Sequence, residues 1–185
     1  MEAGLRLLRS DERLARAFRL MNDAMGRSAH GRYEGWRPFQ TGFLLANLSS
    51  VASPSAEAGI ADIVWFATGG GKTETYLGLL VTAAFHDRLR GKSDGITAWS
   101  RFPLRMLSLQ QTQRFANALA GAEMVRRAER IGGAPFSLGF FVGQSSTPNS
   151  LKHEARSDDP WDPEDDAKLA RAQVLDACPF CRGKS

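Results

Sequence analysis

The N-terminal part of the chain has apolar residues at helical spacing. Between residues 10 and 26 they stand three and four positions apart and would share one face of a helix: Leu14, Phe18, Met21 and Met25. Gly26 suits the end of that helix. After a loop over residues 31–36, Pro38 can open a second helix that runs through Leu48. Serines and Pro54 then break the helical pattern.

Three short apolar runs rich in β-forming residues follow, at 60–66, 96–100 and 138–142. They alternate with two stretches of helical character, residues 72–89 and about 103–130. Such alternation predicts a parallel sheet with helices on its faces. We therefore expect an α/β fold, a partial P-loop domain with a parallel sheet and flanking helices, preceded by N-terminal helices.

A glycine-rich loop joins the first predicted strand to the next helix. Its residues are Thr68, Gly69, Gly70, Gly71, Lys72 and Thr73. Consecutive glycines let several backbone N–H groups converge on one anion, and the positive end of the helix dipole points at the same place. Lys72 can reach the β- and γ-phosphates, and Thr73 can give its hydroxyl to Mg²⁺. The expected ligands are ATP and Mg²⁺.

The loop departs from the strict G-x-x-x-x-G-K-[ST] pattern, because Phe66 stands where the first glycine belongs. The alternative is an ordinary glycine-rich turn with an exposed lysine. Glu74 follows the loop and would repel phosphate if it faced inward, so we expect it to point away as an acid at the helix start.

A T-G-G-G-K-T segment without a leading glycine resembles motif I of superfamily-two helicases. A second segment agrees, because P-L-R-M-L-S-L-Q at 103–110 is similar to the family's P-T-R-E-L-A-x-Q motif. Leu104 and Met106 depart from the family's threonine and glutamate. In that family this motif lies against the nucleic-acid backbone, which implies contacts to DNA or RNA phosphates from Arg101, Pro103, Arg105 and Gln110. A solvated helix position is the alternative for Arg105.

A third segment, R-P-F-Q at 37–40, resembles the glutamine element that precedes motif I in many superfamily-two enzymes. There the glutamine contacts adenine, and the amide of Gln40 offers both a donor and an acceptor for this purpose. The alternative is a glutamine at a helix start beside a buried Phe39.

Together these segments resemble the large helicases of DISARM-type phage-defence systems, from about residue 37 to 149. The resemblance implies three parts. Residues 1–58 form an N-terminal helical segment that carries R-P-F-Q, and 59–150 form part of the first RecA-like lobe. Residues 151–185 form an acidic linker or helix and the start of a zinc ribbon.

The only cysteines, Cys178 and Cys181, form a C-P-F-C sequence. A secreted disulfide framework would contain more of them. Two cysteines at this spacing supply half of a tetrahedral zinc site. We expect Zn²⁺ binding only if a second pair of ligands completes the site, and the chain looks cut off before that pair.

Catalysis in this superfamily needs a D-E-x-[HD] motif and the second lobe, and the chain contains neither. The leading interpretation is therefore the N-terminal, ATP-binding portion of an ATP-dependent helicase or translocase, inactive without the rest of that protein. One alternative is a truncated module that binds nucleotide or nucleic acid without turnover. Another is an unrelated small P-loop NTPase or kinase.

Composition adds little to this interpretation. The 185 residues are 43% hydrophobic and 24% charged, as is usual for globular domains. No apolar run approaches the roughly 20 residues that span a bilayer. The N-terminus is too charged for a secretory signal, so we expect the cytoplasm and no membrane partner. The net charge of +4, carried mostly by arginines, permits a polyanionic partner.

Overall fold

The computed structural model describes residues 1–54, 59, 61–65, 69–102, 105–140, 165, 167 and 173–183, with residues 105–109 described by their backbone. Six helices account for most of this part of the chain. They are α1 (Glu2–Ser10), α2 (Glu12–Ala29), α3 (Pro38–Ala46), α4 (Leu48–Ala52), α5 (Lys72–Leu89) and α6 (Arg105–Ala128).

The predicted N-terminal helix is confirmed as α2. It begins after Asp11, whose side chain accepts a hydrogen bond from the backbone N–H of Leu14 at 2.9 Å, a standard N-cap. The helix continues past Gly26 and ends at Ala29, and its C-cap residue His30 adopts a left-handed conformation with a φ of 48°. The helix expected to open at Pro38 is present as α3 and α4, and the sequence did not predict α1.

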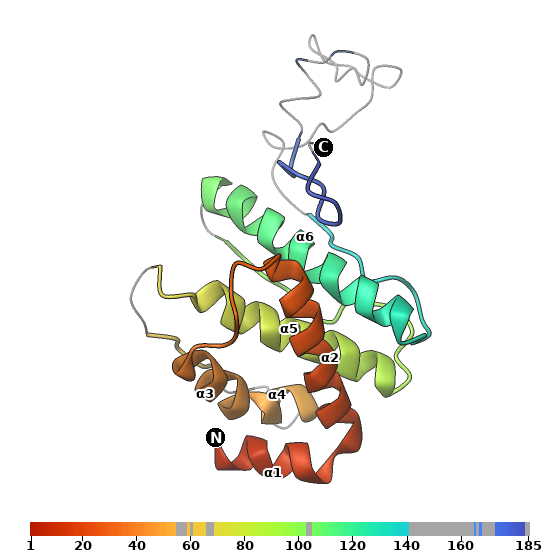
Figure 1. The fold of residues 1–185 in the computed structure, drawn as a ribbon. Helices are drawn as coiled ribbons and strands as arrows, with labels where there is room; N and C mark the ends of the chain where they lie inside the picture. The colour runs from red at the N-terminus through yellow and green to blue at the C-terminus, as the bar shows by residue number, and fades with distance from the viewer. Residues whose placement is uncertain are drawn as a thin grey trace.

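The main core lies where α2 crosses α5 and α6 (Figure 1). Its buried side chains come mainly from these three helices and include Leu20, Met21, Leu77, Phe85, Phe115 and Val125. Small residues allow the helices to approach closely. A Cβ on Gly121 would lie 2.4 Å from the carbonyl oxygen of Ala24, so only glycine fits at this α2–α6 contact.

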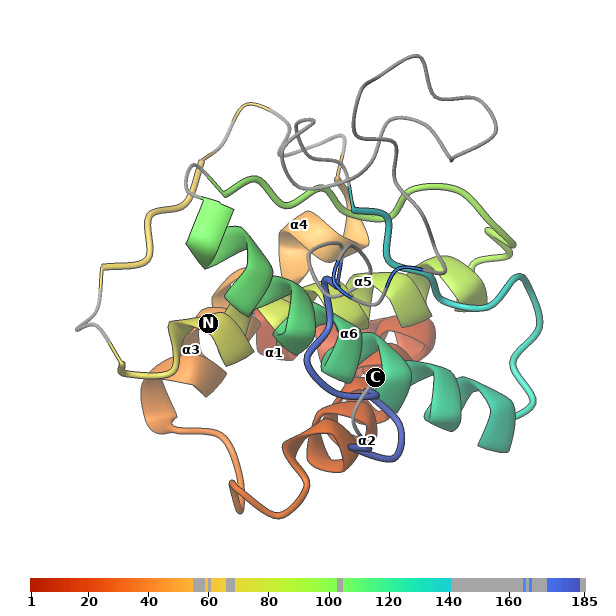
Figure 2. The same cartoon turned by 90° about the horizontal axis from the view of Figure 1, so that it is seen from above.

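Helices α5 and α6 run in the same general direction, with their N-terminal ends on the same side of the molecule (Figures 1 and 2). Their predicted positions are confirmed, since α5 spans Lys72–Leu89 and α6 spans Arg105–Ala128. A smaller cluster of Leu14, Leu45, Leu48 and Val51 joins the N-terminal part of α2 to α3 and α4.

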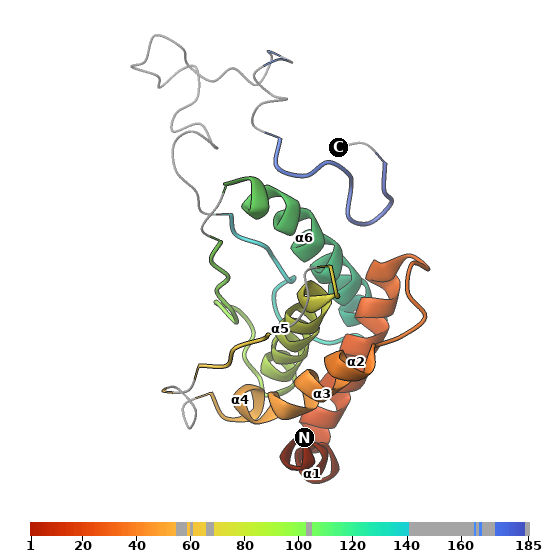
Figure 3. The same ribbon diagram turned by 90° about the vertical axis from the view of Figure 1, so that its left-hand side faces the viewer.

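The prediction of an α/β, partial RecA-like domain with a parallel sheet is wrong, because the described residues form helices and no sheet. The described parts of the three predicted strands (61–65, 96–100 and 138–140) are extended but pair with no other described segment. Figure 3 shows these extended segments on the opposite side of α5 and α6 from α2.

The physical reason is that a strand depends on a partner, since β-propensity is realised only where neighbouring strands pair and pack. Here α5 and α6 bury apolar side chains against α2, and the strand-like segments stay at the surface. Trp65 is 94% exposed and Trp99 is 73% exposed. No helix in the described part of the chain is long and apolar enough to cross a membrane.

Candidate phosphate-binding site

The glycine loop ends at the start of α5, as predicted. Gly69 and Gly71 have φ angles of 79° and 93°, in the left-handed region that favours glycine. Gly71 is the N-cap residue of α5 and Lys72 is its first residue, so the N–H groups of the first helical turn face the loop. Thr68 lies outside the described residues, and the segment before the loop at 61–65 is no strand. Only the helical half of the expected context is therefore present.

Two side chains of the R-P-F-Q segment donate hydrogen bonds to this loop, each to a residue more than thirty positions further along the sequence. The Arg37 guanidinium donates to the carbonyl oxygen of Gly70, and the Gln40 amide donates to that of Gly71, both at 2.8 Å. Gln40 is buried, and its own amide oxygen accepts a hydrogen bond from the backbone N–H of Arg37 at 2.8 Å. The start of α3 is thereby fixed against the start of α5.

These bonds determine where the loop's N–H groups point. In a trans peptide unit the C=O and N–H bonds point in opposite directions, and no peptide bond described is cis. Because the carbonyls of Gly70 and Gly71 face α3, the N–H groups of Gly71 and Lys72 face away from it. N–H groups turned outward at a helix N-terminus are the kind of donors that suit an anion.

The first turn of α5 is connected to α6 by polar contacts. Glu74 forms an ion pair with Arg114, which neutralises its charge beside the loop. The Tyr76 hydroxyl lies 3.2 Å from the hydroxyl oxygen of Thr73 and 3.0 Å from the amide oxygen of Gln111. Thr73, the residue expected to hold Mg²⁺, is thus linked to α6.

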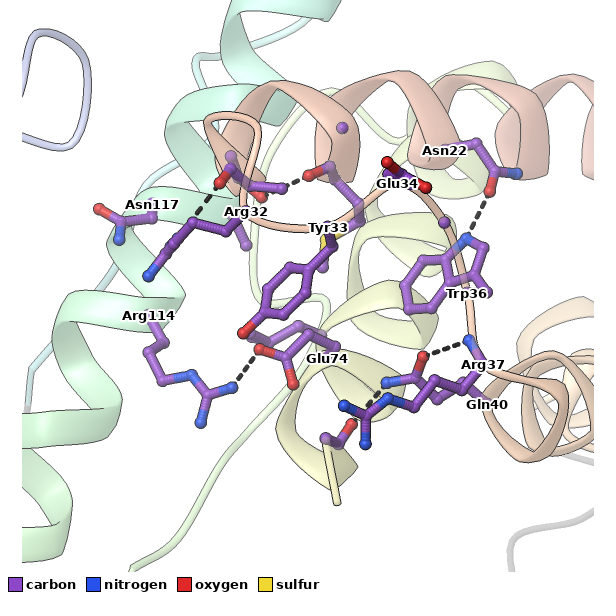
Figure 4. Close-up of a pocket in the computed structure, with 18 of the residues that line it drawn as sticks. Asn22, Arg32, Tyr33, Glu34, Trp36, Arg37, Gln40, Glu74, Arg114 and Asn117 are labelled. Atoms are coloured by element: carbon purple, nitrogen blue, oxygen red, sulfur yellow. Dashed lines mark hydrogen bonds and ion pairs between the residues drawn. The ribbon is translucent and has the colours of Figure 1, made fainter. Parts of the chain in front are cut away.

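A cavity of about 330 Å³ opens beside the loop (Figure 4). It is lined by the end of α2, the connection before α3, the loop, and the facing sides of α5 and α6. Its charged lining residues are Arg32, Glu34, Arg37, Glu74 and Arg114, three positive and two negative. Lys72 and Thr73 do not line it, so the cavity adjoins the loop on the side of Gly69 and Gly71.

Aromatic side chains form the wall of this cavity between α2 and α3. The Trp36 ring lies over α5, since a Cβ on Gly78 would be 2.9 Å from its edge. Its indole N–H donates to the side-chain oxygen of Asn22 at 2.6 Å, which fixes the ring against α2. Tyr33 is 53% exposed, and the Arg32 guanidinium lies 6.0 Å from the centre of its ring. A flat ligand group would find apolar surface here.

The residues expected to contact nucleic acid are placed only in part. Arg101 is exposed in the extended segment before α6, and Arg105 is the first residue of α6. Gln110 is exposed one turn later, and Pro103 lies outside the described residues. The interpretation of these positions as phosphate contacts stays a prediction.

The cysteine pair occupies a tight turn docked on α6. The backbone N–H of Cys178 donates to the carbonyl oxygen of Gly183, and the N–H of Arg182 donates to that of Cys178. The Gln113 side chain holds the residues just before this turn through three hydrogen bonds to the backbone of Asp176 and Ala177. Backbone N–H groups of Cys181 and Phe180 lower the pKa of the Cys178 thiol.

Both cysteines are free thiols. No three histidine, cysteine or acidic side chains come together among the described residues, so a zinc site there would need ligands from elsewhere.

Sequence reasoning did not identify Tyr76, Gln111, Arg114 or Trp36 as part of this site. Tyr76 stands three positions after Thr73, so a shared helix face could have suggested that contact. The partners on α6 carry no such signal, because they meet α5 only through the packing of the two helices.

No protein-family model matches the chain, and no solved structure matches it. The chain is similar to the DISARM protein DrmA of Bacillus paralicheniformis (strain ATCC 9945a / NCIMB 11709 / CD-2), with 38% identity over 125 residues. The match covers 63% of this chain and 11% of the length of DrmA. The chain thus has a distant, partial similarity to a protein of an anti-phage defence system.

Proposed function

We propose that the chain is the ATP-binding part of a larger anti-phage defence protein that uses ATP to move along nucleic acid. The similarity to DrmA supports the defence role. The observation that carries the ATP-binding role is the attachment of the glycine loop to α3. Arg37 and Gln40 hold the carbonyl oxygens of Gly70 and Gly71, which turns the N–H groups of these peptide units away from α3, toward the side from which a phosphate would approach.

In this proposal each residue of the loop has a distinct task. The backbone N–H groups of Gly71 and Lys72 bind phosphate oxygens at the positive end of α5. The Lys72 ammonium adds a charge toward the β- and γ-phosphates, and Thr73 supplies an oxygen ligand for Mg²⁺. ATP with Mg²⁺ would supply the free energy for movement, while hydrolysis would need groups from the rest of the larger protein.

ATP binding by the full 185-residue chain tests the proposal. Calorimetric titration with ATP and Mg²⁺ should show binding that weakens at least about tenfold in Lys72→Ala, the loss expected for one charge-assisted phosphate contact. Lys92→Ala is the matched control, because Lys92 lies just beyond the other end of α5 and pairs there with Asp87. ATP affinity should stay unchanged in this control. Absence of binding at millimolar ATP, or equal effects of the two variants, would contradict the proposal.

The proposed nucleic-acid contact lies at the N-terminal end of α6, which is on the same side of the molecule as the loop (Figure 2). Arg101 and Arg105 would contact backbone phosphates there without reading bases. Replacing both with alanine should weaken binding of a single-stranded oligonucleotide and reduce the salt dependence by about 1–1.5 in log–log slope. The exposed pair Arg6 and Arg9 on α1 is the control, with no effect expected.

A further inference from the structure

We propose that Tyr76 is a positioning residue that directs the hydroxyl proton of Thr73 away from the loop and so presents the oxygen lone pairs of Thr73 to Mg²⁺. This inference rests on the proposed ATP-binding function. It adds to that function a hydrogen-bonded chain of three side chains that reaches from the loop to α6.

The direction of each of these two hydrogen bonds follows from the number of protons that the three side chains can donate. The Tyr76 hydroxyl is within hydrogen-bond distance of Thr73 Oγ1, at 3.2 Å, and of Gln111 Oε1, at 3.0 Å. Tyr76 has one proton to donate, and an amide oxygen can only accept. Tyr76 therefore donates to Gln111, and the bond between the two hydroxyls must use the proton of Thr73. The remaining lone pairs of Thr73 Oγ1 are free to bind a cation.

Packing holds these three hydrogen-bonded side chains in place. Gln111 is only 9% exposed, and the Tyr76 ring packs against Phe115 of α6 with a centroid separation of 6.1 Å. The phenol is thereby held between α5 and α6. Without this acceptor, a threonine in a first helical turn can direct its proton to other nearby acceptors. Because Mg²⁺ requires nearly ideal octahedral geometry, the orientation of one ligand oxygen affects its binding.

The test compares ATP affinity in Mg²⁺ and in EDTA, using a fluorescent ATP analogue and the full chain. The ratio of the two dissociation constants measures the enhancement by Mg²⁺. Tyr76→Phe keeps the ring and its packing but removes the hydroxyl. It should lower the enhancement roughly three- to tenfold, the usual effect of one hydrogen bond, with affinity in EDTA unchanged. Thr82→Val is the control, since it removes a buried hydroxyl of α5 that donates to Gly78 away from the site.

A double variant tests whether Tyr76 acts through Thr73. Once Thr73→Ala has removed the ligand oxygen, Tyr76→Phe should have no further effect on the enhancement, whereas Thr73→Ser should retain it. Gln111→Met removes the acceptor of the Tyr76 hydrogen bond and should also lower the enhancement by Mg²⁺. This variant keeps a test available if Tyr76→Phe fails to fold.

Three results would overturn the inference. One is an unchanged enhancement in Tyr76→Phe, and another is an equal loss in EDTA, which would indicate a purely structural role. The third is an added loss in the Thr73→Ala background. If ATP binds and Lys72→Ala weakens it while Tyr76→Phe has no effect, only this inference falls. If the chain binds no ATP at all, the proposed function falls and the inference falls with it.

Discussion

The side-chain amide of Gln40 donates a hydrogen bond to the carbonyl oxygen of Gly71 at 2.8 Å, although 31 positions separate the two residues. Gln40 lies in the first turn of α3, and Gly71 is the N-cap residue of α5. The bond therefore joins the two segments that a resemblance to superfamily-two helicases singled out in the sequence. It also fixes the peptide plane whose N–H group belongs to Lys72.

Removal of this bond should loosen the loop. In Gln40→Ala the Gly71 carbonyl and the start of α3 each lose a partner, and we expect the free energy of unfolding to fall by about 1–2 kcal/mol. ATP affinity should fall as well, because the N–H groups are no longer held in one direction. Urea unfolding and ATP titration measure the two effects. Thr41→Ala, an exposed change on the same helix, should alter neither.

Gly71 and Gly69 offer a matched pair of substitutions. Both have positive φ angles, so alanine is strained at either position by about 1 kcal/mol. At Gly71 the added Cβ would also lie 2.8 Å from the Gln40 amide nitrogen, while at Gly69 nothing lies within 4 Å. We expect Gly71→Ala to destabilise the chain more than Gly69→Ala. In the Gln40→Ala background the two substitutions should become equal, and a persistent difference there would exclude the clash as its cause.

The long helices could be predicted because their signals are local. Helix α5 can be predicted without any knowledge of its neighbours. Glycines precede it, Lys72 begins it, and no proline interrupts the sequence up to Leu89. The strands could not be predicted in the same way. Ile63 and Trp65 have strong β-propensity, but a strand also requires a partner, and 61–65 pairs with no described segment.

In the candidate site, too, the local features can be predicted and the contacts between distant residues cannot. Its loop can be recognised from consecutive residues, whereas the family resemblance predicts that Gln40 contacts adenine and does not predict the bond of its amide to Gly71. The pairs Glu74–Arg114 and Tyr76–Gln111 connect residues 40 and 35 positions apart on two different helices. No spacing rule joins such residues, because their contact depends on how α5 and α6 pack beside α2.

Two glycines test the closeness of the α2–α6 crossing. Gly121→Ala would place a methyl group 2.4 Å from the Ala24 carbonyl oxygen, so the helices must move apart. Overpacking of this kind typically costs about 1–3 kcal/mol. Gly26→Ala, within α2, meets nothing within 4 Å and should instead stabilise the chain by roughly 0.5–1 kcal/mol through helix propensity. Thermal unfolding of the two variants should shift in opposite directions, and a neutral Gly121→Ala would show that the crossing is looser than described.

The end of α6 depends on a buried carboxylate. The Glu123 side chain is 3% exposed, accepts hydrogen bonds from Arg126 and Arg127, and also accepts one from the backbone N–H of Phe136 at 3.2 Å. The hydrogen bond from Arg126 is the largest cause that lowers the pKa of Glu123 to about 2, against an ordinary value of 4.5. The ionised form is thus favoured by folding, and Glu123 ties the loop after α6 to the helix.

Glu123→Gln should therefore destabilise the chain by about 3 kcal/mol at neutral pH, the free energy that corresponds to a pKa lowered by this amount. Because the pKa is lower in the folded chain, this contribution is complete above pH 4.5 and is lost as the pH falls toward 2. Urea unfolding at pH 7, 4.5 and 3 should show that the difference in free energy of unfolding between wild type and variant narrows only in that acid range.

Glu129→Gln is the control. It breaks an exposed pair with Arg16 at 3.6 Å and should cost under about 1 kcal/mol. A gap that is unchanged down to pH 3 would mean that the ionised carboxylate is not what holds the helix end.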